Sequence, residues 1–287
     1  MTTLHLGTSG FSFDDWRGPV YPGDLPKPHW LAYYEQHLGF NALEINYTYY
    51  QMPSHRTMAT LVKKATPAFR FAIKTHRSMT HDIFQRGGVI MDSPRAFLEF
   101  REGMKPLTDS GRLACVLVQF PSAFTKTAEH QHYLDAAIDR LGGLPLVVEF
   151  RHRSWVAPST FTHLRARGVG ICAVDEPALP SLMPWVPEVT STISYVRFHG
   201  RNAASWFGTS TAERYNYSYN DQELRALAAR VTALRERAAA ALVFFNNCHA
   251  GAAAKNALRF RGLLAEQGWP VPSGCAPDAS LFDLPTN

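Results

Sequence analysis

The chain has 287 residues, of which 46% are hydrophobic and 18% charged, a globular composition that excludes a disordered or fibrous protein. Its net charge of +5 comes from scattered basic residues, which excludes a dense polybasic segment and gives only weak support to nucleic acid as a partner. No secretion signal precedes the first apolar residues and no apolar run could cross a bilayer, so we expect a cytoplasmic protein without a membrane partner.

Short apolar segments alternate with helical patterns along most of the chain. Eight of these segments are predicted strands, at residues 4–7, 42–46, 70–76, 113–120, 146–152, 170–175, 194–200 and 241–247. Continuous apolar runs, such as residues 146–148, are typical of strands that are buried on both faces of a sheet. Parallel strands of this kind need crossover helices, which the apolar spacing predicts at residues 30–38, 55–64, 94–108, 133–141, 159–167, 220–234 and 251–264.

The sixth crossover differs from the others, because residues 176–193 are rich in proline and show no helical stripe. We therefore predict an extended loop there that could cover a pocket. Eight strand–helix units of about 33 residues each, between residues 3 and 264, favour an α/β fold closed into a TIM-type (β/α)8 barrel over an open sheet. No linker divides the chain, so residues 1–287 are predicted to form one domain with residues 265–287 as a surface tail.

Cofactor motifs are absent from the sequence. No glycine-rich dinucleotide motif follows the first strand and there is no Walker loop, so neither NAD nor a nucleotide cofactor is expected, whereas a divalent metal remains open. The cysteines form no close pair, which argues against a structural zinc site or a disulfide framework; they are Cys115, Cys172, Cys248 and Cys275. Because no paired base accompanies Cys248, we interpret it as an incidental thiol rather than a nucleophile.

Polar side chains gather at the carboxyl ends of the predicted strands, where the loops of such barrels build their sites. Successive side chains alternate along a strand, so residues two positions apart share a face. Pairs with this spacing are Glu44 with Asn46, Lys74 with His76, Glu149 with Arg151, and Arg197 with His199. If these faces point inward, acids and bases converge at the barrel mouth, where each buried charge needs a partner. A purely structural ion-pair network is the alternative interpretation.

These strand ends supply the candidate site. The predicted catalytic residues are Glu44, Lys74, Glu149, Asp175 and His199. The predicted substrate-binding residues are Thr8, Asn46, His76, Gln119, Arg151, His152, Trp155, Arg197, Arg201, Tyr215, Tyr217, Asn246 and Asn247. Aromatic residues crowd the same loops, where they either stack on a substrate or seal the mouth. The small residues after Asn247 open a helix, which either binds an anion or makes a tight turn.

Several of these segments together are similar to one known family. They are GTSGFSFDDWRGPVYP, EINYTYYQMP, FRFAIKTHRSMTH, QFPSAF, VVEFRHRSW, YVRFHGR, YNYSYNDQEL, and FNN followed by NA. In this order, over residues 4–264, they resemble the domain of unknown function 72 family. The resemblance implies a TIM-type barrel and no particular reaction, and it implies shared polar positions at Glu44, Asn46, Lys74, Gln119, Glu149, Arg151, His152, Asp175, Arg197, His199 and Asn246. Phe11, Phe13 and Cys248-His249 depart from the residues common in that family.

The leading hypothesis is an enzyme that applies acid–base chemistry to a small anionic substrate, phosphorylated or carboxylated and sugar-like. A hydrolase, lyase or isomerase fits this description. Arg151, Arg197 and Lys74 would hold the anion. Glu149 or Asp175 would act as the general base, with His199 or Glu44 as the acid.

Two other function classes remain open at this point. One is a divalent-metal phosphoesterase or endonuclease-like barrel, with a ligand set drawn from Glu44, Glu149, Asp175, His152 and His199. The other is a non-catalytic protein that binds nucleic acid or a metabolite, for which the basic charge and the aromatic residues give slight support.

Overall fold

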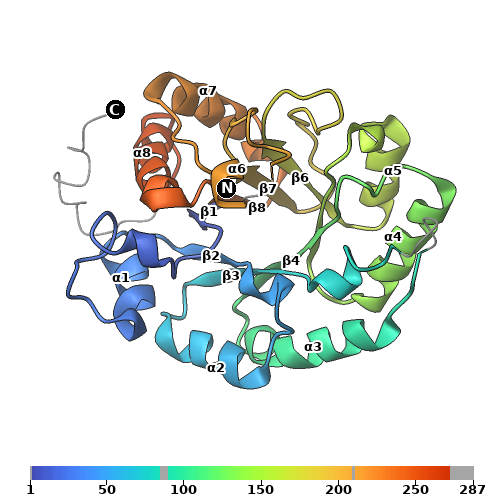
Figure 1. Ribbon diagram of the computed structural model, residues 1–287, viewed down its shortest axis with the longest axis horizontal. Helices are drawn as coiled ribbons and strands as arrows, with labels where there is room; N and C mark the ends of the chain where they lie inside the picture. Colours follow the sequence, from blue (N-terminus) through green and yellow to red (C-terminus); the bar gives the residue numbers. More distant parts are fainter. Residues whose placement is uncertain (1, 85–89, 209–210, 272–287) are drawn as a thin grey trace.

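The computed structural model describes residues 2–84, 90–208 and 211–271. Eight parallel strands form a nearly closed barrel, and the helices between them form an outer ring (Figure 1). The strands are β1 (Thr3–Thr8), β2 (Ala42–Ile45), β3 (Arg70–Lys74), β4 (Leu113–Gln119), β5 (Leu146–Glu149), β6 (Gly170–Asp175), β7 (Ile193–Phe198) and β8 (Ala240–Phe245). The predicted TIM-type barrel is therefore confirmed.

Helices connect the strands at the predicted places. They are α1 (Trp30–Gln36), α2 (His55–Lys64), α3 (Pro94–Asp109), α4 (Ala128–Arg140), α5 (Pro158–Ala166), the short α6 (Thr211–Arg214), α7 (Asp221–Thr232) and α8 (Ala252–Glu266). The short α6 between β7 and α7 is an additional helix that the sequence did not predict. Helix α7 begins at a capping box, in which Asn220 and Glu223 each accept a hydrogen bond from the other's backbone N–H. The sixth crossover, residues 176–192, contains no helix and leads directly from β6 to β7, as its prolines predict.

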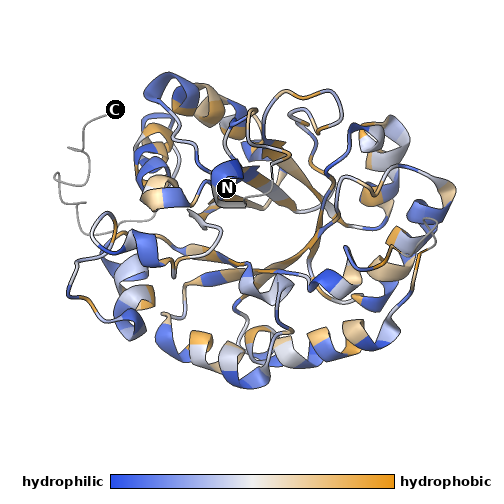
Figure 2. Cartoon of the chain, in the orientation of Figure 1, coloured by the Kyte–Doolittle hydropathy of each residue, from blue (hydrophilic) through white to orange (hydrophobic). Residues whose placement is uncertain are grey.

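The strands are largely apolar and almost entirely buried, apart from the polar residues near their carboxyl ends. Figure 2 shows this pattern as hydrophobic strands at the centre and helices whose outer surfaces are largely hydrophilic. Between the strands and α8, the rings of Phe198, Phe245 and Phe260 pack with centroids 4.7–5.4 Å apart. Each such buried ring contributes about 1.5–3 kcal/mol through the hydrophobic effect. This packing fixes the strands and thereby the positions of the side chains at their carboxyl ends.

The barrel closes between β1 and β2, where side chains replace most of a backbone ladder. Near the mouth, the Gly10 N–H donates to the Glu44 carbonyl at 2.9 Å. Further down, the Asn41 side chain accepts from the Leu6 N–H and donates to the Leu4 carbonyl, both at 2.8 Å. The Asn41 amide therefore satisfies one donor and one acceptor of the β1 backbone.

Tyr34 of α1 completes this seam. Its hydroxyl accepts from the Thr8 N–H at 2.7 Å and donates to the Ala42 carbonyl at 3.2 Å. The Thr8 hydroxyl also lies 3.0 Å from the Tyr34 hydroxyl, so the Thr8 side chain belongs to the seam. Gly7 permits the close approach, because a Cβ at this position would lie 2.0 Å from the Ala42 carbonyl oxygen.

Two further expectations concern the chain as a whole. Across the three described segments, no helix is both long enough and apolar enough to span a bilayer. Cys115, Cys172 and Cys248 are free thiols, and Cys275 lies outside the described residues. Of the predicted tail, residues 265–271 are described: α8 ends at Glu266, and Trp269 is buried.

Candidate functional site

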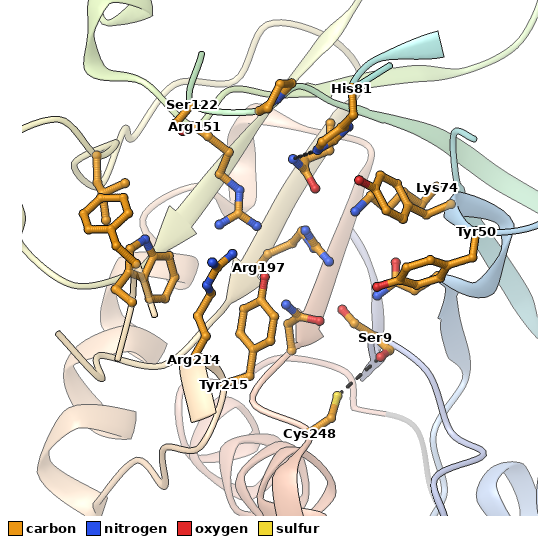
Figure 3. A pocket seen from close by; sticks show the side chains of 18 of the residues that line it. Ser9, Tyr50, Lys74, His81, Ser122, Arg151, Arg197, Arg214, Tyr215 and Cys248 are labelled. Carbon is orange, nitrogen blue, oxygen red and sulfur yellow. Dashed lines mark hydrogen bonds between the residues drawn. The ribbon is translucent and has the colours of Figure 1, made fainter. Parts of the chain in front are cut away.

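A cavity of about 460 Å³ opens at the carboxyl ends of the strands (Figure 3). Each of the eight strands, or the loop that follows it, contributes to its lining: Ser9, Phe13, Asn46, Tyr49, Tyr50, Lys74, His81, Gln119, Pro121, Ser122, Arg151, Leu182, Arg197, Trp206, Phe207, Arg214, Tyr215, Asn246 and Cys248. This set includes one lysine and three arginines, and no aspartate or glutamate belongs to it. The cavity surface is therefore cationic.

The carboxylates that balance these cations lie beneath the cavity surface. Arg197 forms ion pairs of 2.7 Å with both Glu44 and Glu149, and all three side chains are at most 2% exposed. The Tyr195 hydroxyl donates to the second oxygen of Glu44 at 2.6 Å. Burial alone would raise the pKa of Glu149, but the guanidinium groups of Arg151 and Arg197 hold it well below its usual range. Glu149 is thus a permanent anion that positions arginines.

Arg151 is held in the same way from the other side. It pairs with Glu149 at 2.5 Å and with Glu176 at 3.1 Å. Glu176 also accepts from the Met183 N–H at 3.0 Å, which ties the sixth crossover to the site. Burial raises the pKa of Glu176 to about 7. Of residues 176–192, only Leu182 lines the cavity, so this crossover forms part of one wall.

Lys74 is the cation that differs from the others in its surroundings. Its Nζ lies 4.2 Å from the centre of the Tyr49 ring, and it makes no ion pair with any carboxylate in the described part of the chain. Burial and the nearby charge of Arg197 lower its pKa to about 7. A large share of Lys74 is therefore an uncharged amine at neutral pH, which is the form that accepts a proton or attacks an electrophile.

Two histidines at the mouth are neutral at physiological pH. His199 lies between the Asn246 amide, 2.9 Å from Nδ1, and Glu149 Oε1, 3.3 Å from Nε2. Burial and the charge of Arg151 hold the pKa of His199 well below its usual range. His81 lines the cavity, with Nε2 3.5 Å from the Gln119 amide, and burial lowers its pKa to about 3. Both imidazoles serve as hydrogen-bonding groups without a charge.

Several polar atoms of the cavity lining have no hydrogen-bond partner in the described segments. They are Ser9 Oγ, Asn46 Oδ1, Arg197 Nε and Arg214 Nε. Ser9 is 1% exposed and Arg197 is 2% exposed, so neither residue is a surface group. Buried polar atoms normally have partners, because leaving one unpaired costs about 1–3 kcal/mol. Donors and acceptors of this kind are suited to a bound molecule.

The structure places Asp175 away from this cavity. Its carboxylate lies on the helix-facing side of β6, where both oxygens accept from Arg201 at 2.8 Å and one accepts from the Tyr219 hydroxyl at 2.8 Å. Alternation along β6 explains the difference, since Glu176 takes the inward position. Arg201 also pairs with Glu223 at 3.1 Å, which leaves it outside the cavity lining as well.

His76 and His152, both predicted to bind substrate, cap matching turns. Strands β3 and β5 end earlier than predicted, and each is followed by a His-Arg-Ser sequence that forms a 3-10 turn. The Nδ1 atoms accept from the N–H of Ser78 at 3.3 Å and of Ser154 at 3.2 Å. Trp155 is 1% exposed within a stack of aromatic rings. None of the three predicted ligands lines the cavity.

Three more predicted ligands hold the loops together. Thr8 belongs to the β1–β2 seam. The Asn247 amide donates to the carbonyl of Tyr217 and to the Asn256 side chain, both at 2.8 Å. The Tyr217 hydroxyl donates to Glu223 at 2.5 Å. These contacts fix the loop after β7, which carries cavity-lining residues.

The remaining predicted residues do come together. Those that line the cavity are Asn46, Lys74, Gln119, Arg151, Arg197, Tyr215 and Asn246, and those directly beneath its surface are Glu44, Glu149 and His199. Sequence reasoning missed His81 and Arg214. Arg214, the last residue of α6, had a visible signal, because it directly precedes Tyr215, which was predicted to bind substrate.

The metal hypothesis requires its ligands to share one place. Within residues 2–84, 90–208 and 211–271, no group of three or more His, Cys, Asp or Glu side chains is arranged to hold a metal ion. Asp175 faces the helices, His152 caps a turn, and Glu149 is engaged by arginines. The structure therefore does not bring together the ligand set proposed from the sequence.

Comparisons with known proteins agree with this architecture. Residues 5–279 match the family described as "Protein of unknown function DUF72". The UPF0759 protein YunF of Bacillus subtilis (strain 168) is 31% identical over 273 residues, which cover 91% of this chain and 94% of that protein. A DUF72 family protein from Thermotoga maritima MSB8 has a crystal structure that is similar with a TM-score of 0.85 and 41% identity, covering 92% of this chain and 99% of that one. A DUF72 family protein from Enterococcus faecalis V583 matches with a TM-score of 0.79 and 28% identity, covering 96% and 100%.

Proposed function

The chain belongs to the DUF72 family of proteins of unknown function, and we propose that it is an enzyme that binds a small anionic molecule in the barrel mouth. The observation that carries this proposal is the charge of the cavity lining, which among the described residues contains Lys74, Arg151, Arg197 and Arg214 and no acid. A cavity of about 460 Å³ is in the range of small-molecule sites.

The arginines are preorganised to bind an anion. Glu44, Glu149 and Glu176 hold Arg151 and Arg197 from beneath, so these guanidinium groups lose little freedom when a ligand binds. In Figure 3 the guanidinium groups of Arg151, Arg197 and Arg214 point toward the same space. A phosphate or carboxylate group is the ligand that planar guanidinium groups recognise best.

The proton-transfer role is assigned to Lys74. The carboxylate bases proposed from the sequence do not suit this role, because Glu149 is bound by two arginines and Asp175 faces the helices. A general base works best when its pKa is near the operating pH, and the pKa of Lys74 is lowered to about 7. Lys74 also lies in the cavity lining, where a substrate would reach it.

Calorimetric titration with inorganic phosphate at low ionic strength tests the anion site. Arg214→Gln removes a charge that has no ion pair in the described segments, whereas Lys63→Gln removes an exposed charge at the far end of α2. We expect Arg214→Gln to weaken phosphate binding by about tenfold, equivalent to about 1.4 kcal/mol, and Lys63→Gln to leave it unchanged. Absence of phosphate binding to the wild-type chain, or equal affinity in both variants, would overturn the proposal.

A further inference from the structure

We propose that Lys74 is a nucleophile that forms a covalent imine with the carbonyl carbon of an anionic aldehyde or ketone bound in the cavity. This inference rests on the anion site proposed above and names the substrate class of that site. The substrate would carry a phosphate or carboxylate group for the arginines and a carbonyl group within reach of the Lys74 amine.

The position of Lys74 supports this role. It is the last residue of β3, and its carbonyl accepts a hydrogen bond from the Thr48 hydroxyl at 2.6 Å, which anchors the backbone. Its side chain points into the cavity from the side opposite Arg151 and Arg214 (Figure 3). A molecule held by the arginines would therefore present its other end to the amine.

The surroundings of Lys74 also keep the amine available. Arg151 and Arg197 each have carboxylate partners, whereas Lys74 has an aromatic ring, Tyr49, at 4.2 Å and no ion pair within the described ranges. A carboxylate partner would hold the ammonium form, and its absence from the lining leaves desolvation and cationic neighbours to favour the neutral amine. Lysine nucleophiles are activated by these two effects.

The reaction is balanced without a further reactant. The neutral amine of Lys74 adds to the carbonyl carbon, and one N–H proton passes to the carbonyl oxygen to give a carbinolamine. Loss of that hydroxyl group together with the second N–H proton releases one water molecule and leaves the C=N bond. No electron is gained or lost, and hydrolysis reverses both steps.

Reductive trapping tests the inference on the full chain. Dihydroxyacetone phosphate and pyruvate are the anionic probes, dihydroxyacetone is the uncharged control, and sodium borohydride converts an imine into a stable secondary amine. After proteolysis, mass spectrometry locates the modified lysine. We expect the adduct on Lys74 with at least one anionic probe, at a yield about tenfold above that with dihydroxyacetone, because the anion site raises the local occupancy.

Two variants and one reference residue separate the outcomes. Lys74→Met should lose the adduct, and Lys74→Arg should lose it while still binding inorganic phosphate, since a guanidinium group keeps the charge but forms no imine under these conditions. Lys63 is exposed and measures background labelling in the same sample. No adduct on Lys74 with either anionic probe, or labelling equal to that of Lys63, overturns the inference even if phosphate binds. If the wild-type chain does not bind inorganic phosphate, the proposed anion site itself is overturned.

Discussion

Replacing Lys74 with methionine should stabilise the protein, and by an amount that depends on pH. The pKa of Lys74 is lowered from 10.5 to about 7 in the folded chain, so the unfolded chain binds this proton over a range in which the folded chain does not. Through Lys74 alone, the free energy of unfolding of the wild-type protein therefore rises with pH between about 7 and about 10.5. Below pH 7 the destabilising contribution of Lys74 is largest.

The magnitude follows from the same shift. At about 1.4 kcal/mol per pKa unit, burying Lys74 costs about 4 kcal/mol at pH 7 and about 2 kcal/mol at pH 9. Methionine loses the contact of the ammonium with the Tyr49 ring, which offsets about 1 kcal/mol. We therefore expect Lys74→Met to raise the free energy of unfolding by about 3 kcal/mol at pH 7. At pH 9 we expect a rise of about 2 kcal/mol, because the folded-state amine is already neutral there and no ammonium contact is lost.

Urea denaturation of three proteins at both pH values measures this effect. Wild type and Lys74→Met give the difference, and Lys63→Met is the matched control, expected to stay within about 0.5 kcal/mol of wild type because it is exposed. A Lys74→Met protein that is less stable than wild type at pH 7 would refute the reasoning. So would a stability difference that does not shrink by pH 9.

Four further outcomes are expected. Arg197→Met leaves Glu44 and Glu149 without their shared partner and should lower the free energy of unfolding by about 3–5 kcal/mol in urea, with a loss under about 1 kcal/mol as the contrary result. Tyr34→Phe removes the seam hydroxyl and should cost about 1–3 kcal/mol by thermal unfolding. Asp175→Asn should lower stability while calorimetry finds phosphate affinity unchanged; weaker binding would place this carboxylate in the site after all. Sulfate affinity should fall as pH rises through about 7, and it should fall less steeply in Lys74→Met, where Glu176 still loses its proton near pH 7 but no lysine charge is lost.

The architecture of the barrel was accessible from the sequence because buried parallel strands and their helices have distinct apolar spacings. The loop in place of the sixth helix was accessible too, since its prolines are incompatible with a helix interior. Alternation along the strands also predicted that Lys74 and Arg197 would point into the barrel mouth, and both line the cavity.

The details that failed depended on one-residue register and on local turns. Asp175 and Glu176 are adjacent acids, and only the three-dimensional register shows that Glu176 is the one facing inward. The side chains of His76 and His152 would continue the inward face if their strands were longer, but each accepts a hydrogen bond from a backbone N–H instead. Whether such a histidine binds a ligand or caps a turn depends on where its strand ends. Strand ends are the feature that sequence spacing predicts least well.

The seam between β1 and β2 links the integrity of the barrel to the arrangement of charge. Glu44 belongs to both, because its carbonyl accepts from Gly10 across the seam while its carboxylate holds Arg197. Any local opening of this joint must therefore displace one of the two anions that orient the central guanidinium. Amide hydrogen exchange at Gly10 would report local opening of this seam, and the same opening would disorient Arg197 and weaken ligand binding. The seam between β1 and β2 therefore also determines how well the cavity is preorganised for a ligand.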